Sequence, residues 1–220
     1  MAVPLQQLFI GTLRPLPPEG QMTGMFKHPA SGAQTLGATG LHGDEQADLR
    51  HHGGPYKALH HFPAEHYDDF TRLWPERAAI LRPGVMGENL STHGLTEATV
   101  CIGDVFSLGS CRIQISQPRQ PCWKINHRLD TPGASSHVAE SGRTGWYYQV
   151  LQAGTCAAGD TLTLIERPSP WLTLAHYWNT INAHRPDIAV LRRIAAAPGL
   201  APDKAQRHAD RANWLETEAR

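Results

Sequence analysis

The chain of 220 residues is long enough to bury a hydrophobic core without a disulfide or a metal to hold it together. Hydrophobic residues make up 40%, and 20 Gly and 17 Pro indicate many turns. Lys and Arg together number 20, as do Asp and Glu, so the net charge is zero. This balance excludes a nucleic-acid binder held by bulk charge, but it leaves room for a local basic pocket.

Neither a leader peptide nor a membrane span is expected. Residues 1–5 lack the basic and apolar runs of a signal peptide, and no stretch approaches the ~18 apolar residues of a membrane helix. The four cysteines form no CxxC pair and no zinc-finger spacing. We therefore expect a cytoplasmic protein with reduced thiols that contacts neither a membrane nor nucleic acid.

The first part of the chain is typical of a mainly β fold, a β-barrel with short helices. A helix is expected to begin at Pro63-Ala64-Glu65. Its apolar stripe comprises Tyr67, Phe70, Leu73 and Trp74. Alternating or branched segments predict strands at residues 99–102, 105–108, 112–116, 146–151 and 161–166. The first two are expected to pair around a bend at Gly103-Asp104, and many short strands with glycine turns favour a barrel.

The composition changes near residue 167. Nineteen of the 20 glycines precede residue 160, whereas alanine becomes frequent afterwards. Pro168 and Pro170 predict a stiff linker. We therefore predict a main domain at residues 1–167 and a three-helix domain at residues 168–220, with helices near residues 172–179, 188–194 and from Pro202 onward. Its small apolar face suggests packing on the main domain or on a second subunit, so a homodimer is expected.

The loop that follows the strand at 112–116 is the first candidate for chemistry. Pro118 and Pro121 fix two backbone angles in residues 117–124, so the loop is pre-shaped. If a helix begins within residues 123–127, its dipole, Arg119 and Lys124 would favour the thiolate of Cys122. A thiolate is both a nucleophile and a soft metal ligand. The alternative is an inert loop cysteine, which is also our interpretation of the other three thiols.

A second candidate is the glycine-rich segment at residues 40–61. The turn Gly53-Gly54-Pro55 lets backbone N–H groups approach an anion. Basic side chains surround it, namely Arg50, His51, His52 and Lys57. This combination suits a phosphate, although a solvated loop with incidental histidines is the alternative. The pairs His51-His52 and His60-His61 do not favour zinc, because adjacent histidines on a strand point to opposite faces. In residues 84–92, Asn89 suits either a turn or the edge of a heterocycle.

Together these segments resemble the MOSC family, named for the C-terminal domain of molybdenum cofactor sulfurase, and in particular its small YiiM-type members with a three-helix C-terminal appendage. Four blocks match in order: residues 43–57 with Gly43-Asp44, His52-Gly53-Gly54 and Lys57; Gly87-Glu88-Asn89-Leu90; Ile102-Gly103-Asp104; and Gln117-Pro118-Arg119 with Pro121-Cys122 and Lys124. The likeness covers nearly the whole chain. One departure is Tyr56, where the family usually carries an acidic residue.

The resemblance implies a β-barrel that binds a molybdenum–pterin cofactor, with Cys122 as the metal ligand and catalytic residue. It further implies two-electron reduction of N-hydroxylated compounds such as 6-N-hydroxylaminopurine, a detoxification related to that of the eukaryotic amidoxime-reducing proteins. Arg50, His52, Gly53, Lys57 and Arg119 are then expected at the pterin phosphate and pocket, and Asn89 and Lys124 at the pterin or substrate. The chain shows no nucleotide or flavin fingerprint, so a separate reductase is expected to supply electrons.

Two other classes of function fit the same residues. The protein could store or hand on the cofactor without turning over. Alternatively, Cys122 could be a nucleophile for sulfur or acyl transfer, with His127 or a loop histidine as its base. Metal content and thiol reactivity distinguish these hypotheses.

Overall fold

A nine-stranded sheet forms the body of the protein in a computed structural model that describes residues 1–49 and 52–218. Its strands follow the order β1 (Ala2–Pro4), β14 (Thr161–Glu166), β10 (Val105–Leu108), β11 (Cys111–Pro118), β12 (Trp146–Gln152), β8 (Leu59–His61), β9 (Leu90–Ser91), β2 (Gln7–Ile10) and β5 (His28–Pro29). Neighbours are antiparallel except β8 and β9. The strands expected at 105–108, 112–116, 146–151 and 161–166 are all present.

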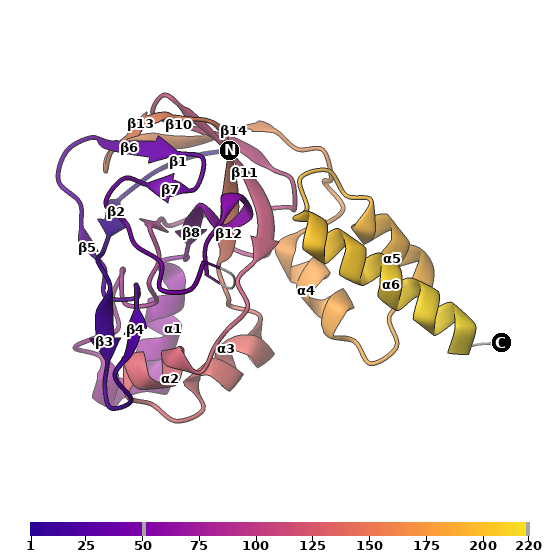
Figure 1. Cartoon of the computed structure of the whole chain (residues 1–220), viewed down its shortest axis with the longest axis horizontal. Helices are drawn as coiled ribbons and strands as arrows, with labels where there is room; N and C mark the ends of the chain where they lie inside the picture. The colour runs from indigo at the N-terminus through magenta and orange to yellow at the C-terminus, as the bar shows by residue number, and fades with distance from the viewer. Residues whose placement is uncertain (50–51, 219–220) are drawn as a thin grey trace.

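The sheet curls strongly, because its first and eighth strands are consecutive in the chain. Only Leu5 and Gln6 separate β1 from β2, so the two ends of the sheet must come close together. Leu5 is fully buried at this seam and donates its N–H to the carbonyl of Asp160. The smaller sheet β13 (Gly154–Cys156), β6 (Gln34–Gly37), β7 (Gly40–Leu41) and the hairpin β3 (Arg14–Leu16), β4 (Gln21–Thr23) complete the wall (Figure 1). The predicted barrel-like fold with short helices is confirmed.

Short helices gather below the open end of the curled sheet (Figure 1). They are α1 (Glu65–Leu73), α2 (Lys124–Leu129) and α3 (Ala134–Ser141), with the 3-10 turn η2 (Pro75–Arg77). The other 3-10 turn, η1 (Pro55–Lys57), packs on β12 and β11 instead. Helix α1 begins as predicted and buries Tyr67 and Phe70, but Leu73 is 47% exposed, so that part of the stripe was wrong. The short α3, which the sequence analysis did not foresee, buries Ala134 and Val138 in the same hydrophobic cluster as Phe70.

The strand expected at residues 99–102 is absent from this described part of the chain, and the expectation is corrected. Cys101 makes only an isolated bridge to Thr173, and β10 pairs with β11 and β14 instead. The reason lies in Asp104, whose buried carboxylate accepts the N–H of Cys101 at 2.9 Å and so closes a tight turn. Arg167 holds the same carboxylate at 2.6 Å, and this ion pair fixes the turn against the end of β14.

Three helices close the chain, α4 (Leu174–Asn182), α5 (Ile188–Ala195) and α6 (Pro202–Glu218). The side chains of Thr173 and Asp187 cap the first two by accepting backbone N–H groups. Tyr177 on α4 and Ile194 on α5 belong to the main hydrophobic core, whereas α5 and α6 share a small cluster around Leu191. The three helices therefore share part of the main hydrophobic core, and Figure 1 shows them extending from the body of the protein. The domain boundary at residues 167/168 stays a prediction.

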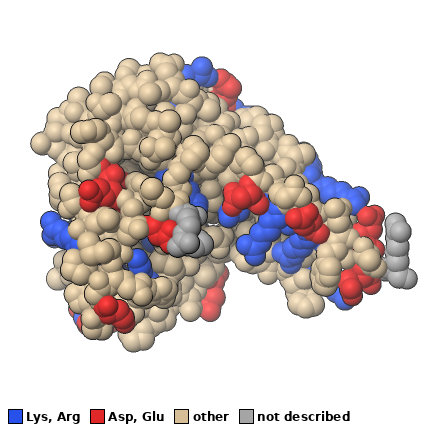
Figure 2. Space-filling model, in the orientation of Figure 1, with Lys and Arg blue, Asp and Glu red and all other residues tan. Residues whose placement is uncertain are grey.

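Charges of both signs alternate along this C-terminal part (Figure 2). Arg192 pairs with Glu216 at 2.7 Å, and Lys204 with Asp203 at 2.7 Å. Such a mixed surface keeps the helices solvated without building a field of one sign. Within residues 1–49 and 52–218, no helix combines the length and the apolar character needed to cross a bilayer. The homodimer stays a prediction.

The buried His61 predicts how stability depends on pH. Its ring bonds to Tyr148 at 3.1 Å and to Thr92 at 3.0 Å, and burial lowers its pKa to about 3. Below pH ~6.5 the ring of His61 therefore stays neutral in the folded protein, whereas the same ring takes up a proton in the unfolded chain. We expect the free energy of unfolding contributed by this group to be fully present above pH ~6.5 and to fall by ~1 kcal/mol per pH unit as the pH drops toward 4.

Urea unfolding of wild type and His61→Gln between pH 7 and pH 4 checks this expectation. The slope of the unfolding free energy against pH should be shallower in the variant. The control His28→Gln changes an exposed histidine and should leave the slope as in wild type. Equal slopes for wild type and His61→Gln would contradict the assignment.

Candidate functional site

One deep pocket collects most of the chemical groups that the sequence analysis singled out. It encloses about 610 Å³ of non-atom space, including the solvent at its open mouth. It is lined by Thr23, Gly24, Met25, Lys27, Asp44, Glu45, Gln46, Ala47, His52, Lys57, His60, Met86, Gly87, Asn89, Arg119, Cys122, Lys124 and Tyr147. These residues come from segments far apart in the chain, and the curl of the sheet brings them together.

Cys122 lies in the loop between β11 and α2 and is partly exposed. Helix α2 begins at Lys124, and the carbonyl of Cys122 accepts the N–H of Ile125 at 3.0 Å, which ties the loop to the first turn. The other cysteines are buried, and burial raises the pKa of Cys156 to about 12. Of the four thiols, Cys122 alone combines access from solvent with a place on the pocket wall.

Arg119 supplies a buried cation to this wall. The residue is 5% exposed, and its Nη1 has no hydrogen-bond partner among the described residues. Burying a guanidinium N–H without an acceptor is costly, so the position favours an anionic or oxygen-rich ligand in front of it. The same guanidinium hydrogen-bonds to Tyr147. Burial raises the pKa of that phenol, and Arg119 opposes the rise.

Further positive charge surrounds the pocket mouth. Lys124 Nζ donates to the carbonyl of Met22 at 2.8 Å, which holds the side chain across the β3–β4 hairpin. Burial lowers the pKa of His52, and Lys124, Arg119 and Lys57 lower it further. His52 is therefore neutral at neutral pH, in a field that is positive enough to attract an anion. Burial also lowers the pKa of Lys57, and the positive charge of Lys204 at the start of α6 lowers it further.

Asn89 lies on the pocket wall, but its amide already bonds to the protein. Its Oδ1 accepts the N–H of His60 at 3.0 Å, and its Nδ2 donates to Phe9 and to Asp44 at 3.1 and 2.9 Å. Asp44 also pairs with the buried Lys27. Burial lowers the pKa of this lysine, although Asp44 opposes the effect. The wall is therefore rigid, and Asn89 positions its neighbours.

One described residue among the predicted contacts does not reach the lining of the pocket. Gly53 lies outside the residues that form it, and a Cβ added there would come within 2.8 Å of the side chain of Leu49. Arg50 and His51 lie outside the described residues. The predicted turn is nevertheless present, because Gly54 has φ +92° and precedes η1.

Lys27, Tyr147 and His60 were not among the predicted cofactor contacts. Tyr147 sits between the core residues Trp146 and Tyr148 on β12, and strand alternation could have pointed it to the opposite face. The imidazole of His60 is 5% exposed, its Nε2 has no described partner, and burial and Arg119 lower its pKa well below the usual value. Lys27 belongs to no local sequence motif that would have indicated it, because its partner Asp44 is distant in sequence.

Zinc and a His127-assisted nucleophile both lack support in the geometry. No group of three metal-binding side chains occurs within residues 1–49 and 52–218. His127 pairs with Glu19 at 3.4 Å and packs edge-on against Trp123, outside the pocket lining. The histidines that share the pocket with Cys122 are His52 and His60.

Comparison with known proteins decides the family. The MOSC domain model matches residues 48–163, which hold the Cys122 loop and most of the pocket. The chain belongs to the MOSC-domain family. It is 43% identical over 152 residues to the protein YiiM of Escherichia coli, covering 69% of this chain and 68% of that protein. The crystal structure of E. coli YiiM superposes on this MOSC protein with a TM-score of 0.80 and 32% identity, over 96% and 92% of the two chains.

A fungal relative extends the comparison. A protein of Gibberella moniliformis named a reductase is 34% identical over 181 residues, which cover 81% of this MOSC protein but 32% of the fungal chain. The likeness therefore concerns about one third of that longer protein.

The unpartnered Nη1 of Arg119 leads to a prediction about both the stability of the protein and its binding of anions. Arg119→Met removes a buried charge and fills similar space, so we expect the unfolding free energy without ligand to change by less than ~1 kcal/mol. In wild type, sulfate should raise the melting temperature through Arg119 and its neighbouring cations. That rise should be largely lost in Arg119→Met.

Thermal unfolding with and without sulfate measures both effects. The control Arg112→Met changes an arginine of β11, the strand that precedes Arg119, which pairs with Glu166 at the surface, and it should keep the sulfate effect. A loss of several kcal/mol in Arg119→Met, with an unchanged response to sulfate, would show that the guanidinium is structural.

Proposed function

We propose that this protein holds a molybdenum–pterin cofactor through Cys122 and reduces N-hydroxylated compounds such as 6-N-hydroxylaminopurine. The observation that supports this best is the combination in one pocket of a reachable thiol with the buried Arg119, whose Nη1 has no partner among the described residues. The family assignment makes a molybdenum cofactor the expected ligand. The fungal relative named a reductase favours reduction as the chemistry.

The residues present fit such a cofactor. A thiolate from Cys122 is the soft ligand that the metal requires. Arg119 Nη1 is a buried donor without a described partner that an anionic, oxygen-rich group would satisfy. His52, Lys57 and Lys124 would bind the phosphate or other anionic groups in the pocket. Arg50 and Gly53, in or next to the glycine turn, remain proposed contacts of the cofactor. The pocket is therefore complementary to the cofactor in both charge and ligand type.

The proposed chemistry is a net reduction in which R–NHOH, two electrons and two protons give R–NH₂ and water. The bound cofactor supplies the two-electron oxygen-transfer chemistry. The chain itself positions Cys122 on a proline-stiffened loop and neutralises anionic charge with Arg119. The buried His60 and the half-buried Tyr147 form part of the pocket wall. Rigid walls of this kind orient a substrate at low entropic cost.

Electrons are proposed to come from a separate reductase. The segment of the fungal protein that resembles this chain is a minor part of a much longer reductase, which is consistent with a redox partner encoded outside the MOSC fold. A cytoplasmic location and the homodimer remain part of the proposal.

Metal content tests the ligand assignment. Wild type purified from a host that makes the cofactor should carry close to one molybdenum per chain, measured by mass spectrometry, and Cys122→Ala should carry less than about a tenth of that, because the thiolate bond is lost. Cys156→Ala, which changes a buried thiol away from the pocket, is the matched control and should load as wild type. Metal-free wild type that iodoacetamide labels at Cys122 would instead favour the nucleophile hypothesis.

Turnover tests the reaction. Molybdenum-loaded wild type with a chemical reductant should convert 6-N-hydroxylaminopurine to adenine, and Cys122→Ala should lose at least ~100-fold in kcat/KM, or ~2.7 kcal/mol of transition-state stabilisation. Stoichiometric metal without any conversion would sink the reductase assignment and leave the carrier hypothesis.

A further inference from the structure

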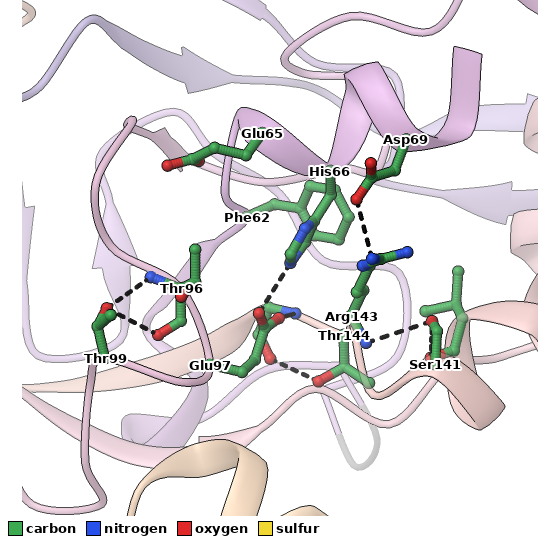
Figure 3. Close-up of polar contacts among 12 residues, drawn as sticks. Phe62, Glu65, His66, Asp69, Thr96, Glu97, Thr99, Ser141, Arg143 and Thr144 are labelled. Atoms are coloured by element: carbon green, nitrogen blue, oxygen red, sulfur yellow. Dashed lines mark hydrogen bonds and ion pairs between the residues drawn. The ribbon is translucent and has the colours of Figure 1, made fainter. Parts of the chain in front are cut away.

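A buried His–Glu pair lies outside the pocket lining, and its two side chains, His66 and Glu97, point toward each other (Figure 3). His66 Nε2 and Glu97 Oε2 are 2.8 Å apart, and each side chain is less than a tenth exposed. His66 lies in the first turn of α1, whereas Glu97 comes from the loop after β9. Burying a carboxylate costs free energy unless its oxygens have partners. The partner of the second Glu97 oxygen therefore indicates the role of the pair.

That second oxygen binds the backbone next to the functional pocket. Glu97 Oε1 accepts the N–H of Gly145 at 2.7 Å. The carbonyl of Gly145 in turn accepts the N–H of Arg119 at 3.0 Å. Gly145 directly precedes β12, in which Tyr147 faces the pocket. One glycine therefore joins Arg119, the residue directly after β11, to the start of β12.

Gly145 is confined to a single arrangement. Its φ is +66°, and an added Cβ would lie 2.3 Å from the carbonyl oxygen of His61 and 3.1 Å from His60 Nε2. A buried N–H in such a junction needs an acceptor, and Glu97 is the acceptor present. The carboxylate supplies a charge-assisted bond, which is stronger than a neutral one.

The C-terminal helices hold the other end of this connection. Ala175, in the first turn of α4, donates its N–H to the carbonyl of Glu97 at 2.8 Å. The His66–Glu97 pair also lines a second cleft together with Trp178 of α4. The carboxylate of Asp69, which lies nearby, pairs with Arg143 at 3.0 Å (Figure 3).

We propose that Glu97, oriented by His66, is a positioning residue that fixes Gly145 and thereby the backbone from which Arg119 and Tyr147 reach the pocket. It does not touch the pocket itself. The proposal rests on the proposed function only in treating this pocket as the functional one.

Hydrogen–deuterium exchange on the full-length protein tests the proposal. In Glu97→Ala, peptides spanning residues 116–124 and 143–149 should exchange roughly tenfold faster than in wild type, about the loss expected for one bond to a charged group. Glu97→Gln should recover most of the protection lost in Glu97→Ala, because its amide oxygen can accept from Gly145, as a neutral acceptor, while its NH₂ donates to the ring of His66. The control Tyr177→Phe breaks a buried 2.7 Å bond to His208 and should leave both peptides unchanged.

Two results would overturn the assignment. One is wild-type exchange in both peptides of Glu97→Ala, and the other is acceleration spread evenly over the chain. If Glu97→Ala fails to fold, His66→Phe should give a weaker acceleration confined to the same peptides, and its absence would equally reject the proposal. The exchange is measured without cofactor, so it stands or falls independently of metal loading or reductase activity.

Discussion

The antiparallel pairing of β11 with β12 is the constraint on which the functional pocket depends. Strand β12 lies between β11 and β8, and its alternation sends Trp146 and Tyr148 into the core while Tyr147 faces the pocket. The pairing slips between Ile115 and Gln117, a bulge of the kind that redirects side chains near functional sites. Because the Cys122 loop follows directly from β11, an error in this register would move the thiol together with Arg119.

The pocket concentrates positive charge where burial makes such charge expensive. Burial lowers the pKa of Lys27, Lys57 and His52, and neighbouring cations lower that of His52 further. Asp44 neutralises Lys27 directly, but Arg119 keeps an unpartnered N–H. A core selected for stability alone would not bury this group. The arrangement is therefore best understood as one half of an interaction, whose other half is an anionic ligand.

Local patterns predicted the strands and helices that short-range physics controls, such as β11 and β14 with their period-two alternation. They failed where a long-range contact decides the outcome. Residues 99–102 have strand-like composition, yet the bonds of Asp104 to Cys101 and Arg167 make a turn of them. The same limit applies to the site. Proline-flanked Cys122 and its cations were visible in one loop, whereas Lys27 and Glu97 act through partners 17 and 48 residues away.

Tyr56 shows why a departure from the family pattern need not disturb the site. Its carbonyl oxygen accepts bonds from Ser116 Oγ at 2.6 Å and Gln117 Nε2 at 3.3 Å, so these bonds to β11 run through the backbone of Tyr56. Any residue that keeps the 3-10 turn at residues 55–57 can supply the same carbonyl. These bonds tie the glycine turn to the strand that leads into the Cys122 loop. The backbone, rather than the side chain at this position, thus couples the two segments that form the pocket.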